Sequence, residues 1–586
     1  MRFGLFYEHQ LPRPWKGDSE YVLFKNALEQ IEIADRLGFD CVWLVEHHFL
    51  EEYSHSSAPE VFLAAASQRT RRIRLGHGIV QIPPRVNHPA RVAERVATLD
   101  LLSDGRVEFG TGESSSAGEL GGFLVDRRQK RAQWEDAIDA ITRMFVEEPF
   151  AGHESQFLQM PVRNVVPKPR QKPHPPLWVA CSRRETIHFA ARKGMGALSF
   201  AFVDPEEAAK WVNEYYTILR SRECVPAGFA VNPNVAVVLP MMVHTNEETA
   251  IERGIDGAHF FGYSLAHYYG FARHQPARTV VWDEFQQRRE STGFSRTAIR
   301  ANREALGVKV LEATGLGSLR GAIGTTRQVT DLLRRYEAAG VDQVIFLVQA
   351  GRNRHEDVCE SLDLFAREVL PSFAANREAG EAAKAARLAP AVEAALARRA
   401  PPRAAPPYEI NELGEMKRAN RARRTAPPEP RLRKARESAD EWVRGRMHAM
   451  IVRAVRGKSD AEIETRFRAR VLQQALFSAL ARGFNPKYAF GFLGEIEYEL
   501  VRSNGSSTST VSDLWTLRVD PNGASAQMAR GQDPALKIRM PLADFVRMLA
   551  GEVPPLEPVL EGRAVMQGDL NLSSRLTEMF GGPSNL

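Results

Sequence analysis

The sequence has few cysteines and no long apolar run. Only four cysteines occur in 586 residues, and no two of them form a C-x-x-C pair. This scarcity argues against a disulfide framework and a thiolate metal cluster, and it fits a reducing compartment. No apolar stretch approaches the roughly 18 residues that span a bilayer, and the N-terminus lacks the apolar core of a signal peptide. We therefore expect a cytoplasmic protein with no metal centre and no stable membrane insertion.

The sequence also lacks a general basic excess. The net charge is +6, from 78 lysines and arginines against 72 aspartates and glutamates. Between Pro371 and Asp440 there are fifteen basic and nine acidic residues, so this segment holds the whole excess. Because a surface that follows nucleic-acid phosphates needs such an excess, the folded parts are not expected to bind nucleic acid.

The segment from Pro371 to Asp440 is poor in aromatic residues. It holds twenty alanines and nine prolines, but its aromatic residues are only Phe373 and Tyr408. This composition predicts a helical spur followed by a semi-flexible linker at 371–440. We interpret its basic residues as a solvated face, with contact to nucleic acid or an acidic partner as the alternative. These residues are Arg421, Arg423, Arg424, Arg431, Arg433 and Lys434.

Residues 1–370 alternate short β-branched or aromatic runs with long amphipathic stretches. This pattern predicts an α/β fold with a parallel sheet. Eight predicted strands favour a (β/α)8 TIM barrel over a doubly wound open sheet, with an insertion at about 246–326 between strands 7 and 8. The predicted strands are Arg2–Glu8, Cys41–Glu46, Ile73–Val80, Val107–Gly110, Leu177–Ala180, Ala197–Phe200, Asn234–Val243 and Gln343–Val348.

The most distinctive cluster is Glu46-His47-His48-Phe49, directly after the second predicted strand. In a barrel this position is the carboxyl-terminal rim, where catalytic groups gather. Two adjacent imidazoles in an extended segment cannot both point inward, so we expect one in the cavity and the other packed outside. Glu46 is placed to orient an imidazole and hold its tautomer. A metal site is the weaker alternative because no third ligand follows at characteristic spacing.

Two glycine-rich stretches do not match nucleotide-binding motifs. GLGSLRG, from Gly315 to Gly321, has the wrong spacing for a dinucleotide fingerprint. GTGESSSAG, after the fourth predicted strand, lacks the Lys-Ser/Thr end of a P-loop.

The order of EHHF, then IRLGHGIVQIPPRVNHPARVAERVATLDLLSDGRVEFGTG, then PPLWVACS resembles the bacterial luciferase-like flavin monooxygenase family. The resemblance covers about residues 1–371. It implies a (β/α)8 barrel that binds reduced FMN from a separate flavin reductase and reacts it with O2 to give a C4a-hydroperoxide. It also leads us to expect a homodimer. A deazaflavin (F420)-dependent oxidoreductase of the same barrel superfamily is the nearest alternative.

The resemblance implies roles for individual residues. His47 matches the acid/base histidine beside the flavin, with Glu46 and His48 near the cofactor. Gly78–Ile79 matches the place of a non-prolyl cis peptide, and His88 matches a histidine that we expect to be structural. The residues expected near the FMN phosphate are Arg131, Cys181, Ser182, Arg183, Arg184 and Thr186.

The sequence departs from the luciferases at Glu113, where they carry an arginine after the fourth strand. One cationic phosphate contact is therefore missing or replaced by Arg183 or Arg184. The insertion is rich in aromatic residues, which we interpret as a lid over an apolar or lipid-like substrate, with simple packing as the alternative. The lid candidates are Phe260, Phe261, Tyr263, Tyr268 and Tyr269, accompanied by His259, His267 and Phe271.

Residues 441–586 show the pattern of a small α+β domain. DPALKIRMPLADFVRMLAG (Asp533–Gly551) and EGRAVMQGDLNLSSRLTEMF (Glu561–Phe580) resemble the sterol carrier protein-2-like lipid-binding domain. The resemblance implies an apolar tunnel for a lipophilic ligand and no catalytic residue. The leading hypothesis is thus a reduced-FMN-dependent monooxygenase with a lipophile-binding domain. A non-catalytic lipid-binding or scaffold protein is the alternative, and Glu113 is the feature that favours it.

Overall fold

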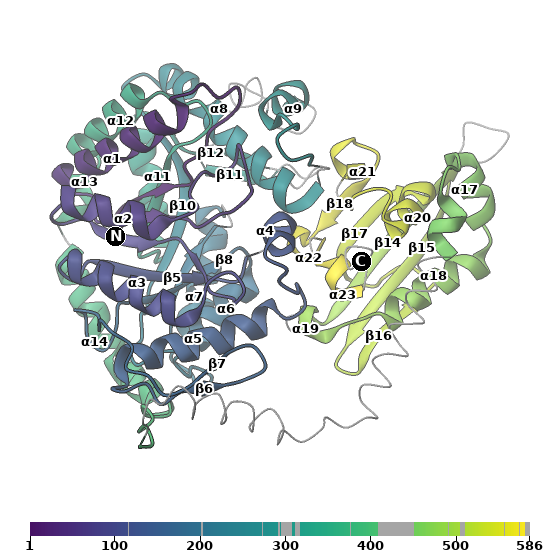
Figure 1. Cartoon of the computed structure of the whole chain (residues 1–586). Helices are drawn as coiled ribbons and strands as arrows, with labels where there is room; N and C mark the ends of the chain where they lie inside the picture. Colours follow the sequence, from purple (N-terminus) through teal and green to yellow (C-terminus); the bar gives the residue numbers. More distant parts are fainter. Residues whose placement is uncertain are drawn as a thin grey trace.

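The computed structural model describes most of the chain in two units (Figure 1). One hydrophobic core forms among residues up to Ala395, and a second forms from Val455 onward. The basic linker residues from Arg421 to Lys434 lie outside the described residues. The described residues are 1–407 and 450–580, without 115, 201–202, 272–273, 291–293, 295–306, 311–316, 376, 490–491, 504–509, 556 and 574.

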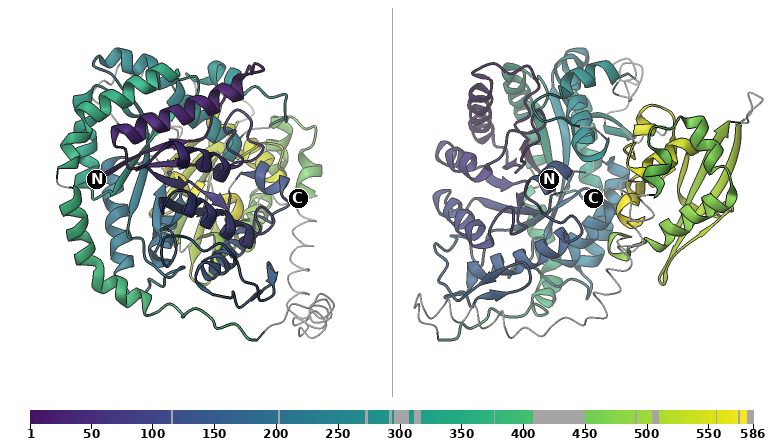
Figure 2. Two further views of the ribbon diagram at one scale, coloured as in Figure 1. Left: turned by 60° about the vertical axis from the view of Figure 1, so that its left-hand side comes forward. Right: turned by 45° about the vertical axis from the view of Figure 1, so that its right-hand side comes forward.

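Eight parallel strands of the described residues close into a barrel, visible in both views of Figure 2. Each strand pairs with the next along the chain, and the last pairs with the first, so the ring is continuous. This closure confirms the predicted barrel. The strands are β1 (Arg2–Tyr7), β2 (Cys41–Leu44), β3 (Arg74–His77), β5 (Val107–Gly112), β8 (Leu177–Cys181), β9 (Gly196–Ser199), β10 (Val235–Val243) and β13 (Gln343–Gln349).

Helices surround the barrel and bury the outer faces of its strands. All nine residues of β10 are buried, because one face meets the barrel interior and the other meets helices. The helix α11 shows the matching pattern: Thr325 caps it, and Val329, Leu332, Leu333 and Tyr336 form its buried stripe. The barrel helices are α1 (Ser19–Leu37), α2 (Pro59–Arg69), α3 (Pro89–Leu102), α5 (Lys130–Val146), α6 (Arg184–Arg192), α7 (Pro205–Leu219), α11 (Thr326–Ala338) and α12 (His355–Glu368).

The predicted insertion lies between the seventh and eighth barrel strands, β10 and β13. Its helix α8 follows β10, and its strand β12 pairs with the carboxyl end of β10. The described elements are α8 (Glu247–Ala266), the π-helix η1 (His267–Phe271), α9 (Val281–Arg288), β11 (Gly307–Val310) and β12 (Gly317–Gly324). Shorter barrel elements are β4 (Val80–Gln81), α4 (Ala117–Gly122), β6 (His153–Glu154), β7 (Gln159–Met160) and α13 (Leu370–Ala374).

The helix α14 (Arg377–Leu396) packs across the amino-terminal end of the barrel, opposite the rim. Its Glu381 pairs with Arg2 at the start of β1, and its Lys384 pairs with Asp342 just before β13. Leu388 is 1 % exposed although Pro390 interrupts the helix two residues later. The predicted helical spur is thus part of the barrel unit, which extends beyond the boundary we expected at residue 370.

The C-terminal unit is an α+β domain with a five-stranded sheet in the order β16-β15-β14-β17-β18. Phe477 stacks on Trp515 and Phe545 in its core. The edge strand β16 escaped prediction because its sequence, GASAQ, has no β-branched or large aromatic residue. The strands are β14 (Gly494–Ser503), β15 (Thr510–Asp520), β16 (Gly523–Gln527), β17 (Pro534–Pro541) and β18 (Val565–Gly568). The helices are α17 (Asp460–Phe467), α18 (Arg470–Arg482), α19 (Pro486–Ala489), α20 (Leu542–Ala550), α21 (Glu557–Leu560), α22 (Leu570–Ser573) and α23 (Leu576–Phe580).

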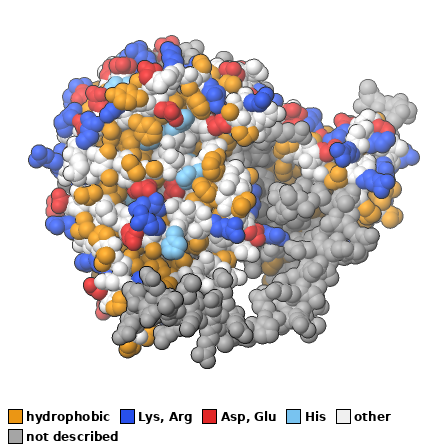
Figure 3. All heavy atoms as spheres, viewed as in Figure 1, with side chains coloured by type: hydrophobic (Ala, Val, Ile, Leu, Met, Phe, Trp, Pro, Cys, Tyr) orange, Lys and Arg blue, Asp and Glu red, His pale blue; other side chains and the backbone are white. Residues whose placement is uncertain are grey.

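The C-terminal unit lies beside the carboxyl-terminal rim of the barrel in Figures 1 and 2. Arg575, between α22 and α23, is fully buried, and its Nη2 donates to Oε1 of Glu185 in α6 at 2.6 Å. On the face shown in Figure 3, acidic, basic and apolar side chains of the barrel are interspersed. None of the described helices is both long and apolar enough to cross a membrane.

Candidate active site

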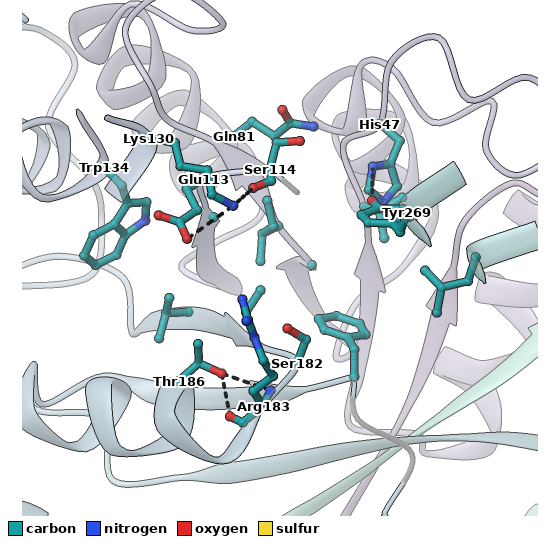
Figure 4. Close-up of a pocket in the computed structure, with 18 of the residues that line it drawn as sticks. His47, Gln81, Glu113, Ser114, Lys130, Trp134, Ser182, Arg183, Thr186 and Tyr269 are labelled. Atoms are coloured by element: carbon teal, nitrogen blue, oxygen red, sulfur yellow. Dashed lines mark hydrogen bonds and ion pairs between the residues drawn. The ribbon is translucent and has the colours of Figure 1, made fainter. Parts of the chain in front are cut away.

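A cavity of about 350 Å³ opens among the carboxyl ends of the barrel strands (Figure 4). This is the end of a barrel where active sites form, and the volume suits a small-molecule site. The lining residues are Glu8, Val45, His47, Tyr53, Gly78, Ile79, Gln81, Gly112, Glu113, Ser114, Arg127, Lys130, Arg131, Trp134, Val179, Ala180, Ser182, Arg183, Thr186, Phe200, Phe261, Leu265 and Tyr269.

The strand ends place apolar residues along the middle of the cavity. Ile79 follows β3, Gly112 ends β5, and Val179 and Ala180 belong to β8. A Cβ added to Gly112 would lie 2.5 Å from Cδ1 of Ile79, so a side chain does not fit there without movement. Ile79 packs directly on Gly112, and these residues give the cavity an apolar middle between its two polar ends.

The two adjacent histidines after β2 face different carboxylates. Nδ1 of His47 lies 3.0 Å from Oε1 of Glu119, and Nε2 lies 3.6 Å from Oε2 of Glu8. Nε2 of His48 lies 3.0 Å from Oε1 of Glu46. His47 therefore enters the cavity while His48 is held outside it, as the sequence predicts.

Glu8 and Glu119 surround His47 in what we call the acidic end of the cavity, formed by Glu8, His47 and Glu119. Glu119 is fully buried and accepts hydrogen bonds from the Gln81 amide at 2.6 Å and the Ser114 hydroxyl at 2.8 Å. Glu8 is 2 % exposed and accepts a hydrogen bond from the Tyr53 hydroxyl at 2.9 Å. These contacts fix three titratable groups next to the open space.

The acidic end shifts the pKa of each of its members. Burial alone would lower the pKa of His47, but Glu119 and Glu8 outweigh it and raise the pKa to about 9. Burial would raise the pKa of Glu119, but His47 outweighs it and holds the pKa below its ordinary value. Burial raises the pKa of Glu8 to about 7, against the opposing effects of His47 and Tyr53. At neutral pH, His47 is cationic, Glu119 is anionic and Glu8 is close to its midpoint.

The opposite end of the cavity is cationic, and we call Arg127, Lys130, Arg131, Arg183 and Glu113 the cationic end. Arg131 contacts Glu113 through two hydrogen bonds of 3.0 Å, and Nζ of Lys130 lies 3.6 Å from the same carboxylate. Burial would raise the pKa of Glu113, but Lys130, Arg131 and Arg183 outweigh it and lower the pKa. Together with Arg127, which also lines this end, the four cationic side chains outnumber the one carboxylate, and this net positive charge suits a phosphate.

The start of α6 completes the cationic end. The Thr186 hydroxyl accepts the Arg183 N–H at 3.2 Å and donates to the Arg183 carbonyl at 2.6 Å, which fixes the first turn. Ser182 and Thr186 both line the cavity beside this turn. The positive end of a helix dipole therefore adds to the charge of the arginines.

Comparison with known proteins decides the family. Residues 1–343 match the luciferase-like monooxygenase family. The chain belongs to this family. Residues 499–581 match the SCP-2 sterol transfer family, in agreement with the resemblance of the C-terminal unit. The chain is thus an enzyme of the luciferase-like monooxygenase family with an SCP-2-type domain after the barrel.

Individual relatives support this assignment. The chain is 25% identical over 382 residues to the oxygenase component of a flavin-dependent trigonelline monooxygenase from Acinetobacter baylyi, a match of 64% of this chain and 97% of the relative. It is 40% identical over 138 residues to limonene 1,2-monooxygenase from Rhodococcus erythropolis, covering 23% and 35%. The crystal structure of monooxygenase RslO1 from Streptomyces bottropensis has the same barrel fold, with 24% identity, a TM-score of 0.50 and coverage of 64% and 100%.

Two residues expected near the FMN phosphate, Arg184 and Cys181, lie outside the cavity lining. Arg184 points outward and pairs with Glu214, because the first turn of α6 directs Arg183 into the cavity instead. Cys181 is buried behind the lining, where its Sγ contacts the Thr186 carbonyl at 3.2 Å. Neither side chain lines the cavity described here.

Glu46 and His48 also stand behind the cavity lining. Glu46 accepts hydrogen bonds from the Gln81 N–H at 2.9 Å and the Asn87 amide at 2.7 Å, and it holds His48. The His48 ring packs edge-on against Phe123 at 4.9 Å. In this structure Glu46 and His48 contact residues behind the cavity and hold its lining in place. His88 caps α3 through Nδ1, which accepts the Ala90 N–H, so its expected structural role is confirmed.

The expected non-prolyl cis peptide is absent from the described residues. All four of their cis bonds precede prolines, and the Gly78–Ile79 bond is trans. In this conformation Gly78 N–H donates to the Leu44 carbonyl at 2.7 Å, and the Ile79 carbonyl accepts the Glu46 N–H at 3.0 Å. These two hydrogen bonds hold the backbone on either side of the trans bond. Gly78 and Ile79 still line the cavity, as predicted.

The aromatic insertion contributes only part of the predicted lid. Phe261 and Tyr269 line the cavity, with Leu265 between them on the same stretch of helix. Phe260 packs on Trp282, Tyr263 on Phe285, and Tyr268 on Tyr53 and His274. His259 contacts the Phe294 carbonyl, His267 pairs with Glu284, and the side chain of Phe271 lies outside the described residues.

Sequence reasoning missed Glu8 and Glu119 at the acidic end and Arg127 and Lys130 at the cationic end. Glu8 carried a usable signal, because a carboxylate directly after the apolar strand FGLFY belongs to the same rim as EHHF. Glu119 carried none, since it reaches His47 from a short helix 72 residues away. Among the described residues, no group of three or more His, Cys, Asp or Glu side chains is arranged to hold a metal ion.

Proposed function

We propose that this chain is the oxygenase component of a two-component monooxygenase that uses reduced FMN and O2 on a small apolar substrate. The observation that carries the proposal is one cavity that joins a net-positive end, suited to a phosphate, to His47 at the rim. The name of the trigonelline relative, an oxygenase component that is flavin-dependent, supports a flavin and a separate reductase.

The residues present fit FMN along the whole cavity. Arg131, Arg183 and the start of α6 would hold the phosphate, because charge-assisted hydrogen bonds and a helix N-terminus both favour an anion. The apolar middle of the cavity, lined by Ile79, Gly112 and Val179, suits the apolar ring system of the flavin. When bound, FMN would supply the electrons with which O2 is activated. The acidic end would then face the reacting centre.

Glu113 no longer favours a non-catalytic role. The resemblance suggested that a cation was lost at this position, but Arg131 and Lys130 neutralise the carboxylate, and Arg127 and Arg183 add further charge. Positive charge is therefore present at this end of the cavity, and it comes mainly from α5 and the start of α6.

The substrate side of the cavity is apolar and aromatic. Phe200, Phe261, Leu265 and Tyr269 line it beside His47. Such a surface favours a hydrocarbon-like or carbonyl substrate with few polar groups. The SCP-2-type domain next to the rim would bind a lipophilic molecule and raise its concentration near the cavity.

The deciding experiment is an anaerobic titration of the full chain with reduced FMN, reduced riboflavin and a reduced deazaflavin. We expect tight binding of FMN alone, followed by an absorbance transient on mixing with O2 that matches neither reduced nor oxidised FMN. Equal affinity for riboflavin would contradict the phosphate site. Tight deazaflavin binding without an oxygen-dependent transient would favour the F420-dependent alternative.

A further inference from the structure

Glu8 has one satisfied carboxylate oxygen and one unsatisfied oxygen. Tyr53 donates to Oε1, whereas Oε2 is buried without a hydrogen-bond partner among the described residues and lies 3.6 Å from Nε2 of His47. Leaving a charged oxygen buried without a donor is unfavourable. A proton on Oε2 removes the charge and converts this oxygen into a donor next to the cavity.

Glu119, the second carboxylate beside His47, is bonded differently. It accepts hydrogen bonds from the His48 N–H at 3.0 Å, the Gln81 amide and the Ser114 hydroxyl, and it contacts Nδ1 of His47 at 3.0 Å. Four donors stabilise the ionised form. Glu119 therefore keeps its charge, while Glu8 is the carboxyl of this pair that can exchange a proton.

We propose that Glu8 is the general acid and base of the cavity and that His47 is the fixed cation beside it. In the acid direction, the Oε2–H bond of Glu8 breaks as an O–H bond forms on a negatively charged oxygen of the substrate. The electron pair stays on Oε2, and the resulting carboxylate is balanced by the His47 imidazolium. A proton from solvent then restores the acid.

The surroundings of Glu8 agree with this division of roles. The titratable groups that face it are His47 after β2, Glu119 in α4, Tyr53 in the following loop and Tyr269 in η1. Burial raises the pKa of Glu8 to about 7, where an acid/base group works best near neutral pH. The pKa of about 9 keeps His47 charged over the same range.

The test is a pH titration of the flavin-free full chain with 13C-labelled histidine, followed by NMR, with His47 assigned from a His47→Gln spectrum. In the wild type we expect the His47 signal to move in two steps, near pH 7 from Glu8 and near pH 9 from its own ring. In Glu8→Gln the lower step should vanish and the upper step should shift to lower pH. In Glu119→Gln the lower step should persist.

A lower step that persists in Glu8→Gln, or a single step in the wild type, would overturn the proposal. Infrared difference spectra provide a second readout: the protonated-carboxyl band that disappears on raising the pH through 7 should be missing in Glu8→Gln. If Glu8→Gln does not fold, Glu8→Asp should keep both signals at a shifted pH. The proposal depends on the proposed function only for the identity of the substrate. The NMR and infrared titrations use the flavin-free chain, so a negative result in them can be told apart from a negative result in the FMN titration.

Discussion

The two ends of the cavity differ in how their charges are held. At the cationic end, arginines and a lysine line the cavity with Glu113, and Lys130, Arg131 and Arg183 lower the pKa of that carboxyl, so it stays ionised around neutral pH. At the acidic end, Glu8 and His47 have pKa values of about 7 and about 9, so their protonation changes within the working range of an enzyme. Figure 4 places Lys130 and Trp134 on one side and His47 and Tyr269 on the other.

This difference separates binding from chemistry in one cavity. Fixed charges give affinity for an anion that does not depend on pH, whereas groups near their midpoint can transfer protons. Most of the charged groups come from separate elements, α5 with the start of α6 at the cationic end and the loops after β1 and β2 at the acidic end, while the segment after β5 supplies Glu113 to one end and Glu119 to the other. Substitutions in α5 or at the start of α6 should therefore affect binding, and substitutions in the loops after β1 and β2 should affect proton transfer.

The largest effect should follow replacement of His47 by alanine. Loss of the cation between two buried carboxylates raises the pKa of Glu8 and stops its proton exchange. We expect the rate of product formation to fall by about 10²–10⁴-fold, with hydrogen peroxide formed instead, while FMN affinity is unchanged. Product and peroxide per flavin oxidised measure this directly. The control is Tyr269→Phe, which removes only a hydroxyl 3.4 Å from Nδ1 of His47. Unchanged coupling in His47→Ala would contradict the role of the acidic end.

The cationic end should respond in binding rather than in chemistry. We expect the double substitution Arg131→Met with Glu113→Gln, which removes both partners of the Arg131–Glu113 ion pair together, to weaken FMN binding about 10- to 100-fold. Riboflavin affinity should not change, because riboflavin has no phosphate. Calorimetric titration of both ligands checks this. Arg184→Met is the matched control, since Arg184 pairs with Glu214 outside the cavity. An equal loss for both ligands would show that the substitution damages the whole cavity.

The proposed acid should also make a pH-dependent difference in stability. The pKa of Glu8 is raised in the folded state from 4.5 to about 7, so stability is lost as the pH rises through this interval. Glu8→Gln has no such proton, and its stability relative to wild type should increase by roughly 2–4 kcal/mol between pH 4.5 and pH 7. Thermal unfolding of both proteins at a series of pH values measures the difference. A constant difference across this interval would mean that Glu8 is ionised throughout.

The sequence predicts the barrel well because strand ends and helix faces follow from local patterns. The run VAVVLPMMV is apolar at every position, and TRQVTDLLRRYEA carries both a cap and a buried stripe. Alternation after a strand predicts that one of the two adjacent histidines faces the cavity, and the family resemblance is what indicated His47. Arg184 shows the limit of this reasoning. Whether Arg183 or Arg184 turns inward depends on the exact start of α6, which no local pattern specifies.

Contacts between distant segments were beyond the sequence. Glu119 reaches His47 through α4, and Arg131 reaches Glu113 across 18 residues, so neither pairing has a local signature. The helix α14 is a further example. Its alanine-rich sequence predicts a helix, but its packing depends on Arg2 and Asp342 at the other end of the barrel.

The smallest effect should come from separating the barrel from the SCP-2-type domain. A protease site has to lie after residue 407, because Arg399 pairs with Asp139 and the Arg403 N–H donates to Glu147. We expect the released barrel to bind FMN as tightly as the intact chain, since every lining residue of the cavity precedes the cut. Release also breaks the contact of Arg575 with Glu185. Its KM for a lipophilic substrate should rise several-fold with kcat unchanged, as when only delivery is impaired. Cleavage removes both the covalent tether and the ion pair between Arg575 and Glu185, whereas Arg575→Met in the uncut chain removes only the ion pair. If the tether is what matters, Arg575→Met should raise KM less than cleavage does. If the ion pair positions the domain, the two changes should raise KM equally.

The released fragment should bind a fluorescent fatty-acyl probe. No probe binding together with an unchanged KM would leave the domain a packing or dimerisation role.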